Sequence, residues 1–553
     1  MRRLALTDVL SRVEADAGKA LEILKEYVRF PTISAHKRAQ PETAAFVRRL
    51  LVENGFEARE YPTDGGPNVV FGQMIVDERK PTLLMYQHYD VQPVDPLNEW
   101  KRDPFDPTIE DGKFWGRGCA DTKGNFIMQL LAVQAWQGVE GRPPINLKFV
   151  VEGEEEVGSP HFGSFVHANQ EILHADGATI EGGDHLHEGT PKIELGCKGI
   201  LYVEMTSRTA KVDQHSSYAA IAPNPAWRLI HALMTLRDAK GRIKVRGWYK
   251  DARRPTAREL RYLRASAFKA DALKEFWGVS EFVGDGNDFD ILRRLIYSPT
   301  CTICGFVSGY IEQGTKTVNP AVAKAKIDFR LVPNMKQEKQ FAKLRDHLIE
   351  KGFGDIELSP AKEALEAAAI SLSARVVKAA IKGSVDAYGR EPEVWPWSAG
   401  ASAHGFFNEV VGVPSISGPG VSYDGSNYHA PNEHFRMGDF VGGSKHMATK
   451  GFGDIEVSPA KESLEAAAIS LNARVVKAAI KGSVDAYGRE PEVWPWSPGA
   501  SAHGFFNKVV GVPSISGPGV SYDGSNYHAP NEHFRMGDFV GGSKHMAAMF
   551  ARM

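Results

Sequence analysis

The stretch TLLMYQHYDVQP (residues 82–93) decides the fold class of this 553-residue chain. It begins with a short, mostly apolar run of strand length, and polar residues follow at once. Similar strand-length runs are INLKFVVE (145–152), GATIE (177–181) and VPSISG (413–418). Such runs are typical of strands that are covered on both faces, as in a parallel sheet packed between helices.

Helical segments lie between these predicted strands. Residues 124–137, GNFIMQLLAVQAWQ, have the apolar spacing of a helix and lie between the first two runs. Strands that alternate with helices along the chain indicate an α/β fold. We therefore expect a mixed, mostly parallel sheet flanked by helices.

The character of the sequence changes at about Gly199. From there, strand-like segments alternate apolar with polar residues, and amphipathic helices follow them. The predicted strands are residues 201–207, 302–310 and 323–333, and the predicted helices are residues 224–238 and 336–352. This pattern predicts an inserted α+β domain at residues 199–358, which divides the first domain into residues 1–198 and 359–449.

A long segment occurs twice near the end of the chain. Residues 351–448 match residues 450–547 at a constant offset of 99, with five differences. The differing pairs are Leu358/Val457, Ala364/Ser463, Ser373/Asn472, Ala399/Pro498 and Glu409/Lys508. We interpret residues 450–553 as a tandem duplicate followed by a C-terminal tail.

Composition and charge exclude several classes of protein. A net charge of −2 gives no basis for binding nucleic acid. No apolar run is long enough to span a bilayer, and acidic residues interrupt the amphipathic segment 1–30, so it is not a signal peptide. Four cysteines make no disulfide framework, and we interpret the Cys301/Cys304 pair as part of a strand. We expect a cytoplasmic protein without nucleic-acid or membrane partners.

Residues that can bind metals follow each predicted strand of the first domain, and one more, Asp121, lies just before the predicted helix 124–137. They are His88 and Asp90, Asp121, Glu154 to Glu156, Glu181 and His429. Because ligands bind beyond the carboxyl ends of the strands in open α/β sheets, we expect these side chains to lie close together. Imidazole and carboxylate without thiolate suit zinc, and manganese or cobalt would also fit.

Two histidines and three carboxylates can hold two metal ions if one carboxylate bridges them. Of the adjacent Glu155 and Glu156, one would bind metal and the other would remain free as a general base. An isolated HxD pair is more often a capped strand end, and an acidic run is more often a solvated turn. The coincidence of five such segments favours the metal site.

Several long motifs resemble one known family in the order expected for it. They are HYDVQPVDP (88–96), PFDPTIEDGKFWGRGCADTKG (104–124), EGEEEVGS (152–159), QHSSYAAIAPNPAWRL (214–229), GTKTVNP (314–320), DFRLVP (328–333) and HAPNEHFR (429–436). The family is that of the di-zinc metallopeptidases and amidohydrolases, which includes carnosinase, cytosolic non-specific dipeptidase, glutamate carboxypeptidase and aminoacylase. The resemblance covers the chain apart from one of its two copies.

The resemblance implies a ligand set for two zinc ions. His88 and Glu181 would hold one ion, and Glu156 and His429 the other. Asp121 would bridge the two ions, with Asp184 as a weaker alternative to Glu181.

The resemblance also implies the catalytic groups. Asp90 would orient His88, and Glu155 would act as general base and acid. The inserted domain would be a lid that also forms a homodimer, and its His215 would stabilise the oxyanion in the neighbouring subunit.

Thr317, Arg330 and Ser402 would contact the substrate, with Arg330 on its carboxylate. Two positions depart from the family pattern. HSG is replaced by HSS with Ser217, and TVIP is replaced by TVNP with Asn319. The expected activity is hydrolysis of dipeptides or short peptides with a free carboxylate. The alternatives are an N-acyl-amino-acid amidohydrolase and a non-catalytic protein inactivated by the duplication.

Each copy carries one candidate histidine, His429 or His528, although one sheet has room for one. The first copy directly follows the predicted helix 336–352, whereas use of the second requires that about a hundred residues loop out. We therefore expect His429 to complete the site and the second copy to have no function of its own.

Overall fold

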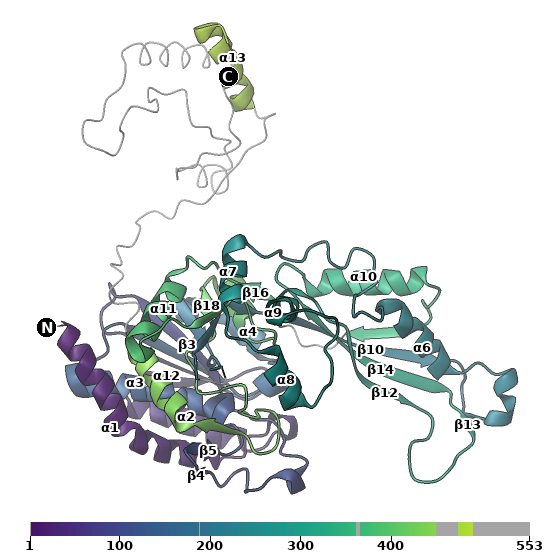
Figure 1. Cartoon of the computed structure of the whole chain (residues 1–553), viewed down its shortest axis with the longest axis horizontal. Helices are drawn as coiled ribbons and strands as arrows, with labels where there is room; N and C mark the ends of the chain where they lie inside the picture. The colour runs from purple at the N-terminus through teal and green to yellow at the C-terminus, as the bar shows by residue number, and fades with distance from the viewer. Residues whose placement is uncertain (1, 187–188, 361–364, 450–473, 490, 492–553) are drawn as a thin grey trace. The chain divides into compact units, whose positions relative to one another are not determined.

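The structure is a computed structural model of the chain (Figure 1). It describes residues 2–186, 189–360, 365–449, 474–489 and 491. The chain divides into two compact units, Met1–Glu456 and Val457–Met553. In the second unit the described element is helix α13 (Arg474–Tyr487), which repeats the sequence of α11 (Arg375–Tyr388). His528 and the second copy of the strand run, residues 512–517, lie outside the described residues.

The catalytic part is built on a six-stranded sheet. In spatial order its strands are β1 (Glu57–Tyr61), β2 (Val69–Met74), β6 (Asn146–Glu152), β3 (Thr82–His88), β7 (Gly177–Ile180) and β18 (Ser415–Ile416). Strand β3 is parallel to β6 and β7, and β18 is parallel to β7, whereas β1 and β2 are antiparallel to their neighbours. The expected α/β fold with a mixed sheet is confirmed.

Both faces of this sheet are covered, which explains its apolar runs. Leu83 and Met85 lie in the core formed with helices α1 (Arg2–Val28), α3 (Gly124–Glu140) and α12 (Met437–Ala448). Leu84 and Tyr86 lie on the opposite face, in a core that includes residues of α4 (Phe162–Ala168). Because alternate residues point to opposite faces, a strand buried on both faces is apolar at every position.

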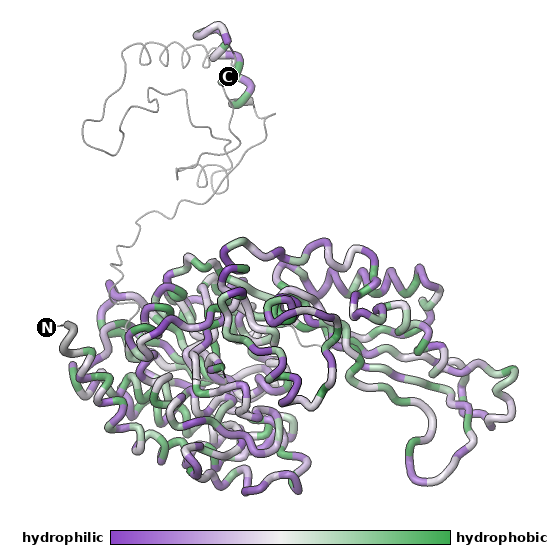
Figure 2. Tube along the Cα trace, viewed as in Figure 1, coloured by the Kyte–Doolittle hydropathy of each residue, from purple (hydrophilic) through white to green (hydrophobic). Residues whose placement is uncertain are grey.

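Helix α1 shows the complementary pattern of a surface helix. Val13, Leu21 and Leu24 are buried, and Figure 2 shows hydrophobic and hydrophilic residues in alternation along the helix. In the described part of the chain, no helix combines the length and the apolar character required to cross a membrane.

The inserted segment forms a separate antiparallel sheet. Its strands, in spatial order, are β12 (Thr302–Ser308), β14 (Val322–Leu331), β10 (Gly199–Arg208) and β15 (Glu357–Pro360). Helices α6 (Pro225–Leu236) and α10 (Gln337–Glu350) pack against it. Asn224 caps α6 by accepting the amides of Ala226 and Trp227. The segment lies between β7 and β18 in the chain, as expected for an insertion, and the predicted boundaries at 198 and 358 stay predictions.

The described residues also form further helices and small sheets. The helices are α2 (Gln40–Glu53), α5 (Gln170–Leu173), α7 (Ala257–Ala265), α8 (Ala270–Trp277) and α9 (Asp288–Tyr297). The small sheets are β4 (Thr108–Glu110), β5 (Lys113–Trp115) and β19 (His434–Arg436); β8 (Lys192–Glu194) and β17 (Glu393–Trp395); β9 (Gly196–Cys197) and β16 (Ala368–Ala369); and β11 (Gln214–His215) and β13 (Val318–Asn319).

Candidate metal centre

The carboxyl ends of the parallel strands gather the predicted ligands into two groups. One group consists of His88, Glu155 and Glu181, and the other of Asp121, Glu156 and His429. Within each group, one potential ligand atom per residue lies within 4.8 Å of the others. His88 ends β3, Glu181 directly follows β7, and Glu155 begins a short helical turn three residues after β6.

The Asp121 carboxylate lies between the two histidines. Its Oδ1 is 3.1 Å from Nε2 of His88, and its Oδ2 is 2.9 Å from Nε2 of His429. The same His429 nitrogen is 3.0 Å from Oε2 of Glu156. One carboxylate with an oxygen directed to each imidazole is the arrangement that two neighbouring cations require of a bridging ligand.

Two residues of these groups have an uncommon backbone conformation. The φ angles of Glu181 and His429 are 55° and 62°, in the left-handed region that residues with a Cβ rarely adopt. Such conformations cluster at functional sites, where the surrounding structure holds them. The positions of both side chains are therefore imposed by the fold.

The site concentrates buried acidic groups. Burial raises the pKa of Glu156, and burial together with neighbouring carboxylates raises the pKa of Glu155, while the pKa of Glu181 rises to about 8 because of burial. Burial opposes the charged imidazole of His429, but the hydrogen bonds that it donates to Asp121 and Glu156 outweigh burial and raise its pKa to about 11. The buried Oε1 of Glu181 has no hydrogen-bond partner among the described residues. Bound cations would compensate this concentration of carboxylates.

Asp90 contacts both the first histidine and the acidic turn. Its backbone oxygen is 3.0 Å and its Oδ1 is 3.4 Å from Nδ1 of His88. Its two carboxylate oxygens accept the backbone N–H groups of Glu155, at 3.2 Å, and Glu156, at 3.1 Å. The second contact was not anticipated from the sequence, and it fixes the turn that presents both glutamates.

The remaining predicted site residues lie elsewhere. His215 in β11 lies beside Thr317, which directly precedes β13, with Nε2 and Oγ1 3.3 Å apart. Figure 1 places β13 at the end of the lid that is remote from β3. Arg330 donates from Nε to Asp328 at 3.1 Å, and the Ser402 carbonyl accepts from the Cys197 thiol at 3.6 Å. Within the described ranges, none of these four forms a hydrogen bond or ion pair with the two metal-ligand groups.

The two departures from the family pattern have structural explanations. The hydroxyl of Ser217 is 2.9 Å from Nδ1 of His215, so the replacement of glycine adds a hydrogen bond to that ring. Asn319 is buried, accepts from Asn224 at 2.7 Å and donates to Gln214 at 3.1 Å. It therefore connects β13 to the start of α6.

Asp184, the alternative ligand, forms an ion pair with Lys192 at 3.1 Å and belongs to neither group. Glu433 has no role among the sequence predictions, but its carboxylate accepts the backbone N–H of Asp121 at 3.1 Å. The sequence feature that could have indicated a role for Glu433 is its place in the HAPNE motif, four residues after His429.

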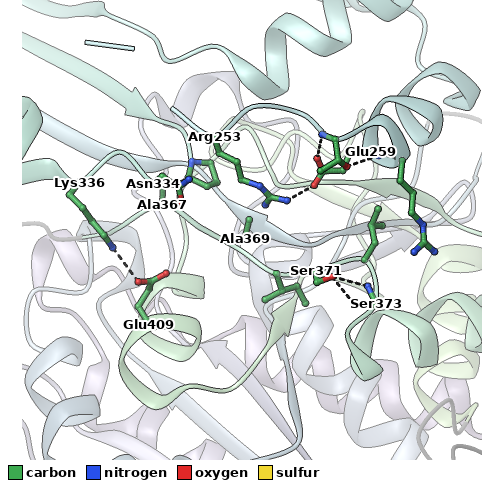
Figure 3. Close-up of a pocket in the computed structure, with 14 residues that line it drawn as sticks. Arg253, Glu259, Asn334, Lys336, Ala367, Ala369, Ser371, Ser373 and Glu409 are labelled. Carbon is green, nitrogen blue, oxygen red and sulfur yellow. Dashed lines mark hydrogen bonds and ion pairs between the residues drawn. The ribbon is translucent and has the colours of Figure 1, made fainter. Parts of the chain in front are cut away.

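A cavity of about 660 Å³ lies where the lid meets the catalytic segments, apart from the metal-ligand groups (Figure 3). The lid residue Lys336 forms an ion pair there with Glu409, at 3.3 Å, and Arg253 pairs with Glu259 at 2.5 Å. No described site residue lines this cavity.

A mixed sheet with imidazole and carboxylate ligands at its strand ends, combined with a separate antiparallel lid sheet, defines a metal-dependent hydrolase. The model of peptidase family M20/M25/M40 matches residues 84–449, and the chain belongs to this family. The resemblance found in the sequence motifs is thereby confirmed.

Curated relatives and solved structures agree with this assignment. The human Beta-Ala-His dipeptidase is 28% identical over 390 residues, 69% of this chain and 76% of that protein. The Cys-Gly metallodipeptidase of Saccharomyces cerevisiae is 26% identical over 471 residues, 80% of this chain and 97% of that protein. The crystal structure of an M20 family metallo-carboxypeptidase from Sulfolobus solfataricus is 36% identical, with a TM-score of 0.74, and the match covers 78% of this chain and 98% of that one.

Proposed function

We propose that this protein hydrolyses the peptide bond of dipeptides, or of short peptides with a free carboxylate, in the cytoplasm. The observation that carries this proposal is the Asp121 carboxylate between His88 and His429, with Glu155 and Glu156 beside it. The names of the relatives, a Beta-Ala-His dipeptidase and a Cys-Gly metallodipeptidase, support a dipeptide as the substrate.

The donor set fits two divalent cations, and zinc is the ion we expect. His88 and Glu181 would hold one ion, Glu156 and His429 the other, and Asp121 both. When bound, the cations would polarise the scissile carbonyl and lower the pKa of water. The unpartnered Oε1 of Glu181 supports this fit, because a buried carboxylate oxygen without a partner is costly.

Glu155 is the proposed general base and acid. Its pKa is raised by burial and by the neighbouring Glu181, and a higher pKa makes a carboxylate a stronger base. Asp90 accepts the backbone N–H of Glu155 at 3.2 Å and so holds the backbone from which this side chain extends. The carboxylate would take a proton from the attacking water and pass it to the departing amine.

The lid would supply the groups that bind the substrate. Arg330 would form paired hydrogen bonds with the carboxylate of the substrate, with Thr317 and Ser402 as further contacts. His215 would stabilise the oxyanion in the neighbouring subunit of a homodimer. The position of His215 in the remote part of the lid agrees with action on another subunit.

The lid also has a surface suited to a homodimer. Trp227 and Met234 on α6 are 62% and 67% exposed, and Ile303 on β12 is 55% exposed. Strand β12 is an edge of the four-stranded sheet, so its outer backbone groups are available for pairing. Exposed apolar groups next to an open strand edge are typical of an interface.

The experiment that tests this function compares the parent with the variants His429→Ala and His528→Ala. Zinc-dependent hydrolysis would be measured with a dipeptide panel and with an N-acyl amino acid. We expect dipeptide hydrolysis by the parent and by His528→Ala, and its loss in His429→Ala. The family match, which ends at residue 449 with the first copy, supports this expectation.

Each other result has a defined meaning. Loss of activity in His528→Ala alone would assign the site to the second copy. Preference for the N-acyl substrate would identify an amidohydrolase. A parent that binds no metal and hydrolyses neither substrate would contradict the enzymatic function.

A further inference from the structure

Glu433 is a buried carboxylate that joins the two loops of the metal-ligand groups. Its side chain follows His429 by four residues and is 1% exposed. Oε1 accepts the backbone N–H groups of Ala120, at 2.9 Å, and Asp121, at 3.1 Å. Oε2 accepts from Gly118 N at 3.0 Å and from Arg117 Nη1 at 2.8 Å.

These four hydrogen bonds fix the short segment that ends in Asp121. Gly118 has a φ of 82°, and a Cβ at this position would approach Val91 Cγ1 to 2.4 Å. The turn is therefore irregular. The backbone N–H groups of Gly118, Ala120 and Asp121 lie outside the strands and do not belong to a β-ladder. The carboxylate of Glu433 replaces such partners and holds three amides from one side.

The backbone of the same residue adds to this connection. The Glu433 carbonyl accepts from Gly116 N at 3.1 Å, and His434 in β19 pairs with Trp115 in β5. The loop that carries His429 is thus connected to the segment that carries Asp121 by a strand pair and by one carboxylate. Because charge-assisted hydrogen bonds are stronger than neutral ones, the carboxylate is the stronger constraint.

Arg117 donates to Glu433 in this buried place, and its charge opposes the rise in the pKa of Glu433 that burial causes. The guanidinium is 2% exposed, donates to Pro93 O at 3.1 Å and lies over the Trp100 ring at 5.0 Å. Loss of the carboxylate would leave a buried cation and three amides without an acceptor. A glutamine can accept with one end only, so it satisfies at most one of the two donor pairs.

We propose that Glu433 is a positioning residue that fixes Asp121 between His88 and His429 and thereby sets the affinity of the site for metal. This inference rests on the proposed function, because it concerns the same two cations. It assigns the role to a side chain that is not itself a proposed ligand and that acts through the backbone of Asp121.

The test measures zinc affinity of the full chain by competition with a chromophoric chelator. Glu433→Gln is expected to lower zinc affinity about 10- to 100-fold, as is usual for residues that orient a ligand. With excess zinc, KM for the dipeptide is expected to stay near the parent value, because the proposed substrate contacts are untouched. Glu433→Asp retains the charge but shortens the reach, and is expected to fall between parent and Glu433→Gln.

Matched variants separate positioning from general stability. Glu259→Gln removes another buried carboxylate that pairs with an arginine, Arg253, in the lid. It is expected to lower the melting temperature without changing zinc affinity. Glu532→Gln alters the equivalent residue of the second copy and is expected to change neither quantity.

Two results would overturn the inference. One is an unchanged zinc affinity in Glu433→Gln and Glu433→Asp while the parent binds two zinc ions. The other is an equal loss of affinity in Glu259→Gln, which would indicate an effect of stability alone. A parent that binds no zinc would instead contradict the proposed function, so the two failures are distinguishable.

Discussion

At the residue scale, the site is a set of buried carboxylates. Burial disfavours their charged form, and bound cations would stabilise it. Burial raises the pKa of Glu155, Glu156 and Glu181, whereas Asp121, which contacts both histidines, has a lowered pKa despite its burial. The carboxylate whose pKa falls is therefore the one that lies between the two imidazoles. The pKa values shift in different directions because the four carboxylic acids have different surroundings.

Glu155→Gln tests the base. Glutamine has nearly the same shape but cannot take up a proton, so kcat for dipeptide hydrolysis is expected to fall about 10²- to 10⁴-fold. Zinc content, measured by atomic absorption, is expected to remain at the parent level. A variant that retains most of its activity would remove Glu155 from the mechanism.

Lys198 gives a pH dependence that is independent of the metal site. Its buried ammonium donates to Leu295 O and Ser298 O, both at 2.7 Å, and burial lowers its pKa to about 7. Between pH 7 and 10.5 the unfolded chain binds the additional proton, so this residue makes stability rise with pH.

From pH 7 to 8 the free energy of unfolding of the parent is expected to increase by about 1 kcal/mol relative to Lys198→Met. The measurement is urea unfolding of the metal-free proteins at both pH values. Lys240→Met at an exposed site is the control, and parallel pH profiles for parent and Lys198→Met would contradict the assignment.

At the element scale, the two sheets have different exposures. The central strands are covered on both faces, whereas β12 at the edge of the lid sheet is mostly exposed along its length. An open strand next to the apolar surface of α6 is an aggregation hazard unless another chain covers it. The homodimer that we propose would remove this hazard and bring His215 to a second site.

Met234→Glu tests this surface. A carboxylate within an apolar interface loses its hydration, so the dimer dissociation constant is expected to rise at least about tenfold. Light scattering during gel filtration would follow the change from dimer to monomer, with Lys19→Glu on α1 as control. If the parent itself is a monomer at micromolar concentration, the proposed dimer is wrong.

At the scale of the whole molecule, connectivity favours the first copy. It continues directly from α10, whereas docking of the second copy would require a closed loop of about a hundred residues. The first copy has Glu409 where the second has Lys508, and Glu409 pairs with the lid residue Lys336. This difference adds a small preference for the first copy. With side chains 41% and 51% exposed, this pair contributes at most about 1 kcal/mol.

Two single-copy chains test the role of the duplication. A chain that ends at Thr449 is expected to retain the dipeptidase activity and zinc affinity of the parent. A chain in which residues 351–449 are deleted is also expected to be active, since 93 of 98 repeated positions are identical, but less stable by about 1 kcal/mol because Lys508 then faces Lys336. Inactivity of the first chain would give the second copy a function that we do not assign to it.

The sequence by itself determined the fold class, and it predicted an insertion and a set of candidate metal-binding residues. These properties follow from local patterns: apolar runs of strand length, and histidine or carboxylate directly after them. The motifs also identified the family. Each of these signals lies within about ten consecutive residues, so it can be read without knowledge of contacts.

Only the tertiary structure decided which groups touch. The pairing of Glu433 with the amides of Gly118, Ala120 and Asp121 joins positions more than 300 residues apart. The contact of Asp90 with the Glu155–Glu156 turn likewise joins residues that are distant in the sequence, because Asp90 follows β3 and the turn follows β6. A buried carboxylate is placed by the donors that the fold assembles around it, and those donors are backbone amides, which carry no signature in the sequence.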